Sequence, residues 1–317
     1  MRHLHLLLAL CLGIGIPVGA QDYPTKPVRL IVGVAPGGGV DTLTRSIATR
    51  LTESLKQTVV VDNRTGAGSS IATEITARAA PDGYTLMMVT ASLVIYPSMY
   101  RASYDPLRDV APVIQVVTVP LLVVINPAVP AQTVSALIAL AKEKPGTINY
   151  ASSGSGGFIH LTGELFKAAT GTDLVHIPYK GNAAVYPDLI AGQTQVGFTA
   201  ISSAMPHVKS GRLRALAVTS RARSKSVPEL PSLAEAGVPG FDVTQWYGVV
   251  ATAGTPRPVI DRLQREITAV LQQPDVIARL AMEGDSINSS PAQFAQHIRS
   301  EFEKWGKVIR QSGIRGE

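Results

Sequence analysis

A short, mostly apolar run that leads through a glycine-rich loop into helically spaced apolar residues is the pattern that most restricts this fold. Residues 28–32 form such a run, residues 35–39 hold three glycines in a row, and apolar positions from 40 to 55 recur three and four apart. The same order begins again at residues 59 and 148. Strands that alternate with helices predict an α/β fold with mostly parallel sheets flanked by helices.

The strand and helix units fall into two series, which predicts two lobes. The second series begins with the apolar run at residues 121–125, and the chain after residue 250 returns to helical spacing. We expect lobe 1 to comprise residues 22–121 and 248–317, and lobe 2 to comprise residues 122–247. Two chain crossings, near residues 121 and 247, would then join the lobes and leave a ligand cleft between them.

The N-terminus has the pattern of a secretory signal peptide. Arg2 precedes an apolar run over residues 4–16, and the small residues Val18 and Ala20 suit a signal-peptidase site. We expect residues 1–20 to be removed by cleavage after Ala20. The apolar run is shorter than the roughly 20 residues that span a bilayer.

Composition excludes several classes of protein. Cys11 is the single cysteine and lies in the predicted signal peptide, so the mature chain is expected to have no disulfide, no thiolate nucleophile and no cysteine metal site. The 29 Lys and Arg exceed the 23 Asp and Glu without forming a basic block. This distribution argues against nucleic acid as a partner and favours, weakly, an anionic small ligand.

The loops at residues 35–39 and 152–157 are candidate anion sites, because each ends at a predicted helix start with unpaired N–H groups. A tight turn without a ligand is the alternative for an isolated glycine loop. Two such loops, one in each lobe, favour a cleft that receives donors from both sides, including serine hydroxyls. Lys180 could add positive charge there or be a solvated surface lysine, and both readings stay open.

The sequence does not match three common enzyme and cofactor-binding motifs. Val40-Asp41 replaces the Lys-Ser/Thr of a P-loop, the third glycine of a dinucleotide fingerprint is missing after Gly68, and there is no Gly-x-Ser-x-Gly elbow. No cofactor or metal site is predicted. A secreted hydrolase that uses Ser153 and His160 remains the alternative function, although a lone histidine at such a position is more often a packing or capping residue. Asp41 is expected to order its loop.

Several stretches together carry a family resemblance. They are residues 28–32, 35–41, 63–68, 81–86, 150–154, 160–161, 178–181, 214–220, 234–237 and Trp246. With these stretches the sequence resembles the Bug family of solute receptors, the TctC-like binding components of tripartite tricarboxylate transporters, over essentially the whole mature chain.

The resemblance implies a type II periplasmic-binding-protein fold and a monomeric periplasmic receptor that is not an enzyme. It implies capture of a small organic carboxylate or dicarboxylate and delivery to membrane transporter subunits or to a sensor. Two departures from the family pattern lie near the expected ligand. Gly33-Val34 replaces the usual proline and aromatic residue, which is expected to enlarge the pocket. Thr199-Ala200 replaces a common Asp-Asn pair and so removes a carboxylate that could hold an amino group, which favours a plain organic acid over an amino acid. The expected ligand-binding residues are Ala35, Pro36, Gly37, Gly38, Gly39, Thr90, Ala91, Ser92, Ser152, Ser153, Gly154, Ser155, Gly156, Lys180 and Thr199.

Overall fold

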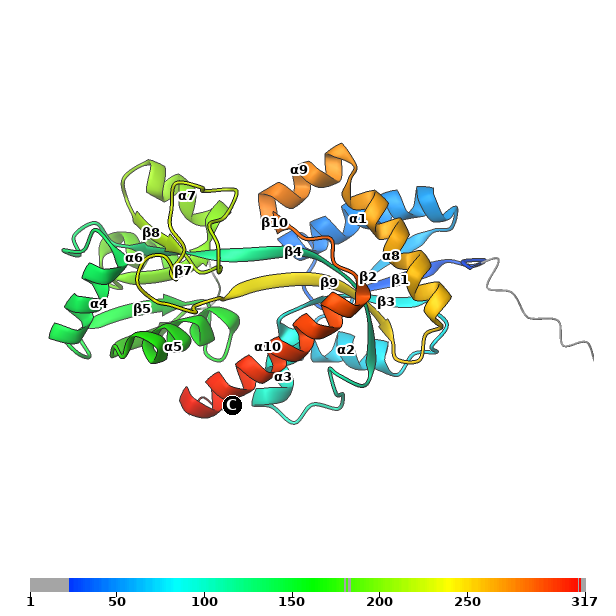
Figure 1. Ribbon diagram of the computed structural model, residues 1–317, viewed down its shortest axis with the longest axis horizontal. Coiled ribbons are helices and arrows are strands. Elements are labelled where there is room, and N and C mark those ends of the chain that lie inside the picture. The colour runs from blue at the N-terminus through cyan, green and yellow to red at the C-terminus, as the bar shows by residue number, and fades with distance from the viewer. Residues whose placement is uncertain (1–22, 180, 182–183, 313, 315–317) are drawn as a thin grey trace, which may run out of the picture.

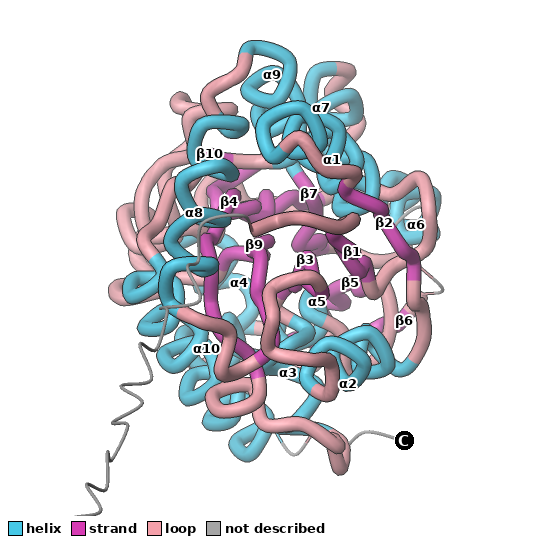
Figure 2. The backbone as a smooth tube through the Cα atoms, turned by 90° about the vertical axis from the view of Figure 1, so that its right-hand side faces the viewer, coloured by secondary structure: helices cyan, strands magenta, loops and turns pink. Residues whose placement is uncertain are grey.

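The computed structural model describes residues 23–179, 181, 184–312 and 314. The predicted signal peptide and its cleavage site after Ala20 lie outside the described residues. The chain forms two lobes side by side along the long axis, each with helices packed around its strands (Figure 1). Viewed end on, helices lie on both sides of the strands, and β2 and β6 lie toward one margin (Figure 2).

The first lobe is built on three parallel strands, with the first strand of the chain between the other two. Its elements are β1 (Val28–Val32), α1 (Gly39–Leu55), β2 (Val59–Asn63), the 3-10 helix η1 (Ala67–Ser69), α2 (Ser70–Ala77), β3 (Thr85–Thr90), α3 (Ser92–Met99), α8 (Arg257–Leu271), α9 (Pro274–Glu283) and β10 (Asp285–Ser286). Val28 pairs with Val59, and Leu30 pairs with Leu86. The carboxyl ends of parallel strands share one edge, so the loops that lead into α1, η1 and α3 lie at that edge.

The second lobe repeats this arrangement with β5 between β6 and β7, all three parallel. Its elements are α4 (Val134–Glu143), β5 (Ile148–Ser152), α5 (Phe158–Thr170), β6 (Leu174–Pro178), α6 (Val185–Ala191), β7 (Val196–Ala200), α7 (Ile201–Lys209) and β8 (Arg214–Val218). A threonine just before an apolar helical pattern predicts an N-cap, and Thr133 caps α4: its side chain accepts a hydrogen bond from the Ala136 N–H at 3.1 Å.

Two long strands connect the lobes. β4 (Val110–Ile125) pairs with β9 (Thr244–Thr252) as far as Pro120, and from Leu121 it pairs with β7 and β8 instead. These pairings are antiparallel, and so is that of β9 with β3. The sequence predicts this strand only over residues 121–125. Residues 110–120 were not predicted, because Pro112 and the polar Gln115 interrupt the apolar run.

A buried threonine ties β4 to the residue that precedes β9. The Thr219 hydroxyl accepts from the Leu121 N–H at 2.9 Å and donates to the Val243 carbonyl at 2.7 Å. The Thr219 main chain adds a bond to each of the same two residues, both at 2.9 Å. One residue therefore holds both segments where the chain passes between the lobes.

The C-terminal helix α10 (Pro291–Ser312) contacts both lobes. It packs on α3 and β4, and the Trp305 ring meets the Phe158 ring of α5 edge to face at 5.4 Å. The indoles of Trp305 and Trp246 both donate to the buried Glu301 carboxylate, at 2.9 and 3.3 Å. Trp246 therefore belongs to the core. The sequence assigned the C-terminal helix to the first lobe, but α10 also contacts the second lobe.

One apolar residue of α2 lies at the surface. Helical spacing predicts from the sequence that Ile71 points inward, and this prediction is wrong, because 45% of Ile71 is exposed. The buried face of α2 consists of the small residues Ser70, Ala72, Thr73 and Thr76, which let this helix approach its neighbours closely. Across the described residues, no helix combines the length and apolar character needed to span a membrane.

Candidate functional site

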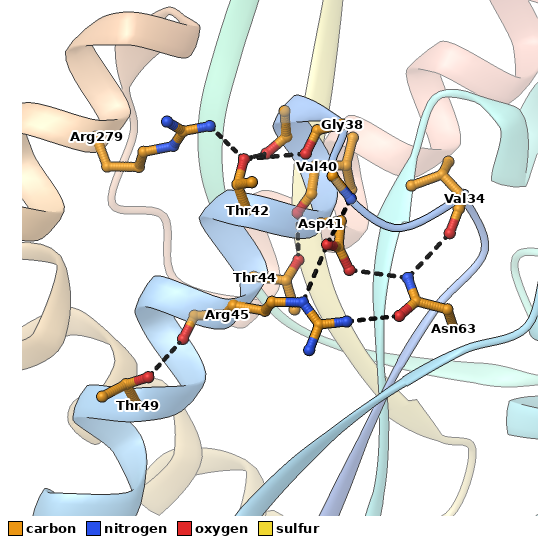
Figure 3. A network of polar contacts seen from close by, with 12 residues as sticks. Val34, Gly38, Val40, Asp41, Thr42, Thr44, Arg45, Thr49, Asn63 and Arg279 are labelled. Atoms are coloured by element: carbon orange, nitrogen blue, oxygen red, sulfur yellow. Dashed lines mark hydrogen bonds and ion pairs between the residues drawn. The ribbon is translucent and has the colours of Figure 1, made fainter.

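The loop between β1 and α1 is held by the Asp41 side chain (Figure 3). One carboxylate oxygen accepts from the Gly37 N–H at 2.9 Å and from Arg45 Nε at 3.0 Å. The other accepts from Asn63 Nδ2 at 2.8 Å, and Asn63 Nδ2 also donates to the Val34 carbonyl. Asp41 therefore orders the loop, as the sequence predicted.

Electrostatics keep Asp41 ionised. Burial acts to raise the pKa of its carboxyl group, but hydrogen bonds from Arg45, Gly37 and Asn63 hold that pKa below its usual value. The buried Asp41 side chain thus stabilises the loop from the interior of the lobe, while residues 35–38 are exposed at the surface.

Helix α9 lies against the start of α1 and brings two charged side chains to it. Arg279 donates to the Thr42 hydroxyl and forms an ion pair with Glu283 at 3.3 Å. The Glu283 carboxylate lies so close to Gly39 that a Cβ there would overlap it. Burial raises the pKa of Glu283, although the nearby Arg279 opposes that shift. Sequence reasoning missed both residues, because no local pattern links residue 39 with residue 283.

The second loop is held in the same way. The Gly156 N–H donates to His160 Nδ1 at 2.9 Å, four residues along the chain, as Gly37 does to Asp41. The His160 ring stacks on the His176 ring at 3.6 Å between centroids. Burial lowers the pKa of His160, and burial with the neighbouring ring lowers that of His176 to about 4. Both rings are therefore neutral at pH 7, as an acceptor nitrogen on His160 requires.

Both loops end in uncapped helix starts. The N-cap residues of α1 and α5 are Gly38 and Gly157, and neither position has a side-chain hydrogen bond to the first turn. The N–H groups of a first helical turn have no partner within the helix, and the helix dipole makes them attractive to anions. Each lobe thus presents one set of donors from a glycine-rich loop.

A pocket of about 490 Å³ lies between elements of both lobes. From the first lobe come η1 and α3, and from the second lobe comes the loop that leads into α5. The residues that line it are Ala67, Gly68, Ser92, Ile95, Tyr96, Met99, Tyr100, Ser155, Gly156, Gly157 and Phe158. This size suits a small organic ligand.

Three predicted ligand residues, Ser92, Ser155 and Gly156, line this pocket. The other predicted residues, except Lys180, lie outside the pocket lining. They are Ala35, Pro36, Gly37, Gly38 and Gly39 in the first loop, Thr90 and Ala91 at the end of β3, Ser152, Ser153 and Gly154 at the start of the second loop, and Thr199 in β7. Lys180 is outside the described residues.

Some predicted residues are already engaged within the fold. Ser152 is fully buried, and its hydroxyl hydrogen-bonds to His176 Nε2 at 2.6 Å and to the Gly154 main chain. Ser152 can therefore shape the loop without presenting its hydroxyl to a ligand. Ala91 is also fully buried, and 6% of Thr199 is exposed.

The pocket contains side chains that sequence reasoning missed. Tyr96, Met99 and Tyr100 come from α3 and its C-terminal end, and Phe158 opens α5. Large apolar and aromatic residues of this kind are indistinguishable in the sequence from residues of the hydrophobic core. Only the meeting of the two lobes places them around one pocket.

The geometry does not assemble a serine hydrolase from Ser153 and His160. His160 Nδ1 already accepts from the Gly156 N–H, and the serine that contacts a histidine is Ser152, whose partner is His176. A nucleophile needs a base within hydrogen-bond reach. In the part of the chain that the structure describes, no group of three or more His, Cys, Asp or Glu side chains is arranged to hold a metal ion.

Comparisons with known proteins agree over nearly the whole chain. The model of the tripartite tricarboxylate transporter family receptor, TctC, matches residues 43–314. Protein BugT of Bordetella pertussis is 38% identical over 310 residues, which cover 96% of this chain and 94% of BugT.

Two solved structures with named ligands are similar to this fold. R. palustris Rpa4515 with adipate has a TM-score of 0.77 and 35% identity, covering 93% of this chain and 99% of that protein. MatC from Rhodopseudomonas palustris with bound malate has a TM-score of 0.73 and 27% identity, covering 90% of this chain and all of MatC, 100%.

Proposed function

Because this chain belongs to the tripartite tricarboxylate transporter receptor family, we propose that it captures a small organic carboxylate in the cleft between its lobes. The family consists of periplasmic solute-binding receptors, so the chain is a receptor and not a hydrolase. One observation carries the proposal for the ligand. In each lobe a glycine-rich loop leads into a helix whose N-cap, Gly38 or Gly157, has no side-chain hydrogen bond to the first turn. A carboxylate is the kind of group that such donors bind.

The proposed grip consists of main-chain N–H groups from residues 35–39 and 152–156, with further contacts from Thr90, Ser92, Ser155, Thr199 and Lys180. Pro36 has no N–H group, and the N–H groups of Gly37, Gly154 and Gly156 already donate within the loops, so the remaining residues of each loop supply the donors. The bound adipate and malate of the two similar structures support a carboxylate as the ligand. Asp41 and His160 hold the two loops in shape from within each lobe.

The remaining parts of the proposal concern the whole receptor. We propose that cleavage after Ala20 releases a monomer into the periplasm, and that this monomer delivers its ligand to transporter subunits in the membrane. The proposed lobes are residues 22–121 with 248–317, and residues 122–247. The transfer of β4 from one set of partner strands to the other between Pro120 and Leu121 supports the first boundary.

A comparison of acids with their amides tests the carboxylate grip. A panel of short mono- and dicarboxylates is titrated into the mature protein by calorimetry, beside the amide of each acid. Charge-assisted hydrogen bonds are each worth about 1.5–3 kcal/mol, so conversion to the amide is expected to weaken binding at least a hundredfold. If an acid and its amide bind with equal affinity, the proposed grip is wrong.

Gly38→Val provides a matched test in the protein. A Cβ at Gly38 would meet only the Ala35 carbonyl oxygen, at 3.9 Å, so the fold is expected to stay intact. The branched side chain would cover the N–H groups at the start of α1 and abolish binding of the acid. Full binding by a folded Gly38→Val variant would remove the first loop from the site.

A further inference from the structure

We infer that the ligand carries its carboxylate on an uncharged apolar body, and that Tyr96, Met99, Tyr100 and Phe158 select that body. The inference rests on the proposed carboxylate grip and extends it to the rest of the ligand. Its basis is the pocket beside the second glycine loop, where side chains from both lobes surround about 490 Å³.

Rings and a flexible thioether form the walls of this pocket. The Tyr96 and Tyr100 rings stack at 4.7 Å with an angle of 27° between their planes. On the opposite lobe, the Phe158 ring packs edge to face against the Trp305 ring. Tyr96 is also held from the η1 side, since a Cβ on Gly68 would lie 3.3 Å from its ring.

Met99 brings the apolar wall to the glycine loop. Its methyl group lies so close to Gly156 that a Cβ on this glycine would overlap it. Methionine adapts its shape and makes favourable contacts with rings. A ligand held at the start of α5 therefore has the Met99 side chain beside it, and its body extends toward the tyrosines and Phe158.

The polarity of the pocket favours acids with an apolar body over acids with a second carboxylate. No side chain among its described lining residues is charged, and its polar side chains are the hydroxyls of two serines and two tyrosines. Among these described residues a second carboxylate would find no cation to offset the loss of its water, which is costly. An apolar chain or ring instead gains contact with four large side chains.

Hexanoate and adipate test this inference, because the two six-carbon acids differ only in the second carboxylate. Calorimetry on the mature protein is expected to show hexanoate binding at least tenfold more tightly than adipate. Equal affinity, or tighter binding of adipate, would overturn the inference while leaving the carboxylate grip in place. If neither acid binds, the inference also fails, and the panel of acids and amides decides separately whether the receptor takes carboxylates.

Two variants locate the selectivity. Met99→Lys would place an ammonium group in the pocket and is expected to reverse the preference in favour of adipate. Met282→Lys is the matched control, since 61% of Met282 is exposed on α9, and it should leave the ratio of the two affinities within twofold of wild type.

Phe158→Ala covers the case in which Met99→Lys does not fold. Loss of the ring is expected to weaken hexanoate binding at least fivefold and adipate binding by a smaller factor, so that the ratio of the two affinities falls. If Phe158→Ala weakens both acids equally, the ring supports the loop rather than selecting the ligand, and the inference is overturned.

Discussion

At the scale of single residues, the two loops are held by the same device with different chemistry. A side chain on the first turn of the helix accepts a hydrogen bond from the glycine N–H four residues earlier, from Gly37 to Asp41 and from Gly156 to His160. Asp41 accepts as a buried anion with three donors, and His160 accepts as a neutral ring. The first loop therefore depends on an ionised acceptor, and the second depends on an unprotonated one.

Asp41→Ala is expected to lower the free energy of unfolding by about 2 kcal/mol, because it leaves the Gly37, Arg45 and Asn63 donors without their shared acceptor. Urea denaturation measures the change. Asp261→Ala removes an exposed ion pair with Arg257 and is expected to change stability by less than about 0.5 kcal/mol. Equal losses in the two variants would show that the Asp41 network does not stabilise the fold.

The histidines predict a pH dependence with a definite sign. An unfolded histidine binds a proton as pH falls below 6.5, whereas burial and the His160 ring lower the pKa of His176 in the folded protein to about 4. His160 and His297 are shifted in the same direction by burial. The unfolded state thus binds more protons in this range, so the free energy of unfolding should decrease as pH falls from 6.5 toward 4.

Urea denaturation in steps from pH 7.5 to 4.5 measures this decrease. In His176→Asn the decrease should be smaller, because one of the three shifted groups is gone. A wild-type stability that is constant, or that rises, over this range would contradict the protonation states assigned to the two stacked rings.

At the scale of elements, the second loop depends on how closely α5 approaches β5. Gly163 faces the Tyr150 ring, and a Cβ there would overlap ring carbons, so the helix sits closer to the sheet than any larger residue permits. The Tyr150 hydroxyl in turn donates to Glu164 at 2.7 Å. The close contact at Gly163 fixes how far α5 lies from the sheet, and the position of Gly157 at the start of that helix depends on this distance.

Gly163→Ala is therefore expected to lower the free energy of unfolding by about 1–3 kcal/mol through overpacking, despite the better helix propensity of alanine. Thermal and urea unfolding measure the effect. Ala168→Ser, on the exposed face of the same helix, should change stability by less than about 0.5 kcal/mol. A stabilised Gly163→Ala variant would show that the space beside Tyr150 can open.

At the scale of the whole molecule, the connection between the lobes depends on Thr219. Thr219→Val keeps the shape of the side chain but leaves the buried Leu121 N–H without its acceptor and the Val243 carbonyl without its donor. We expect a loss of about 2–3 kcal/mol in the free energy of unfolding. Thr219→Ser keeps the hydroxyl and should lose about half as much, and the reverse order of the two variants would contradict this role.

The local units were predictable from the sequence, because strand, loop and helix signals depend on neighbouring residues. The strand at residues 28–32, the helix start at Phe158, the Thr133 cap and the loop-ordering role of Asp41 all follow from local spacing. Tertiary structure alone decided which side chains meet across long separations. Glu283 lies against Gly39, and Met99 against Gly156, because the two lobes and the returning helices fold onto each other. Apolar residues that face such a pocket have the same sequence signal as core residues, so only the packed chain distinguishes them.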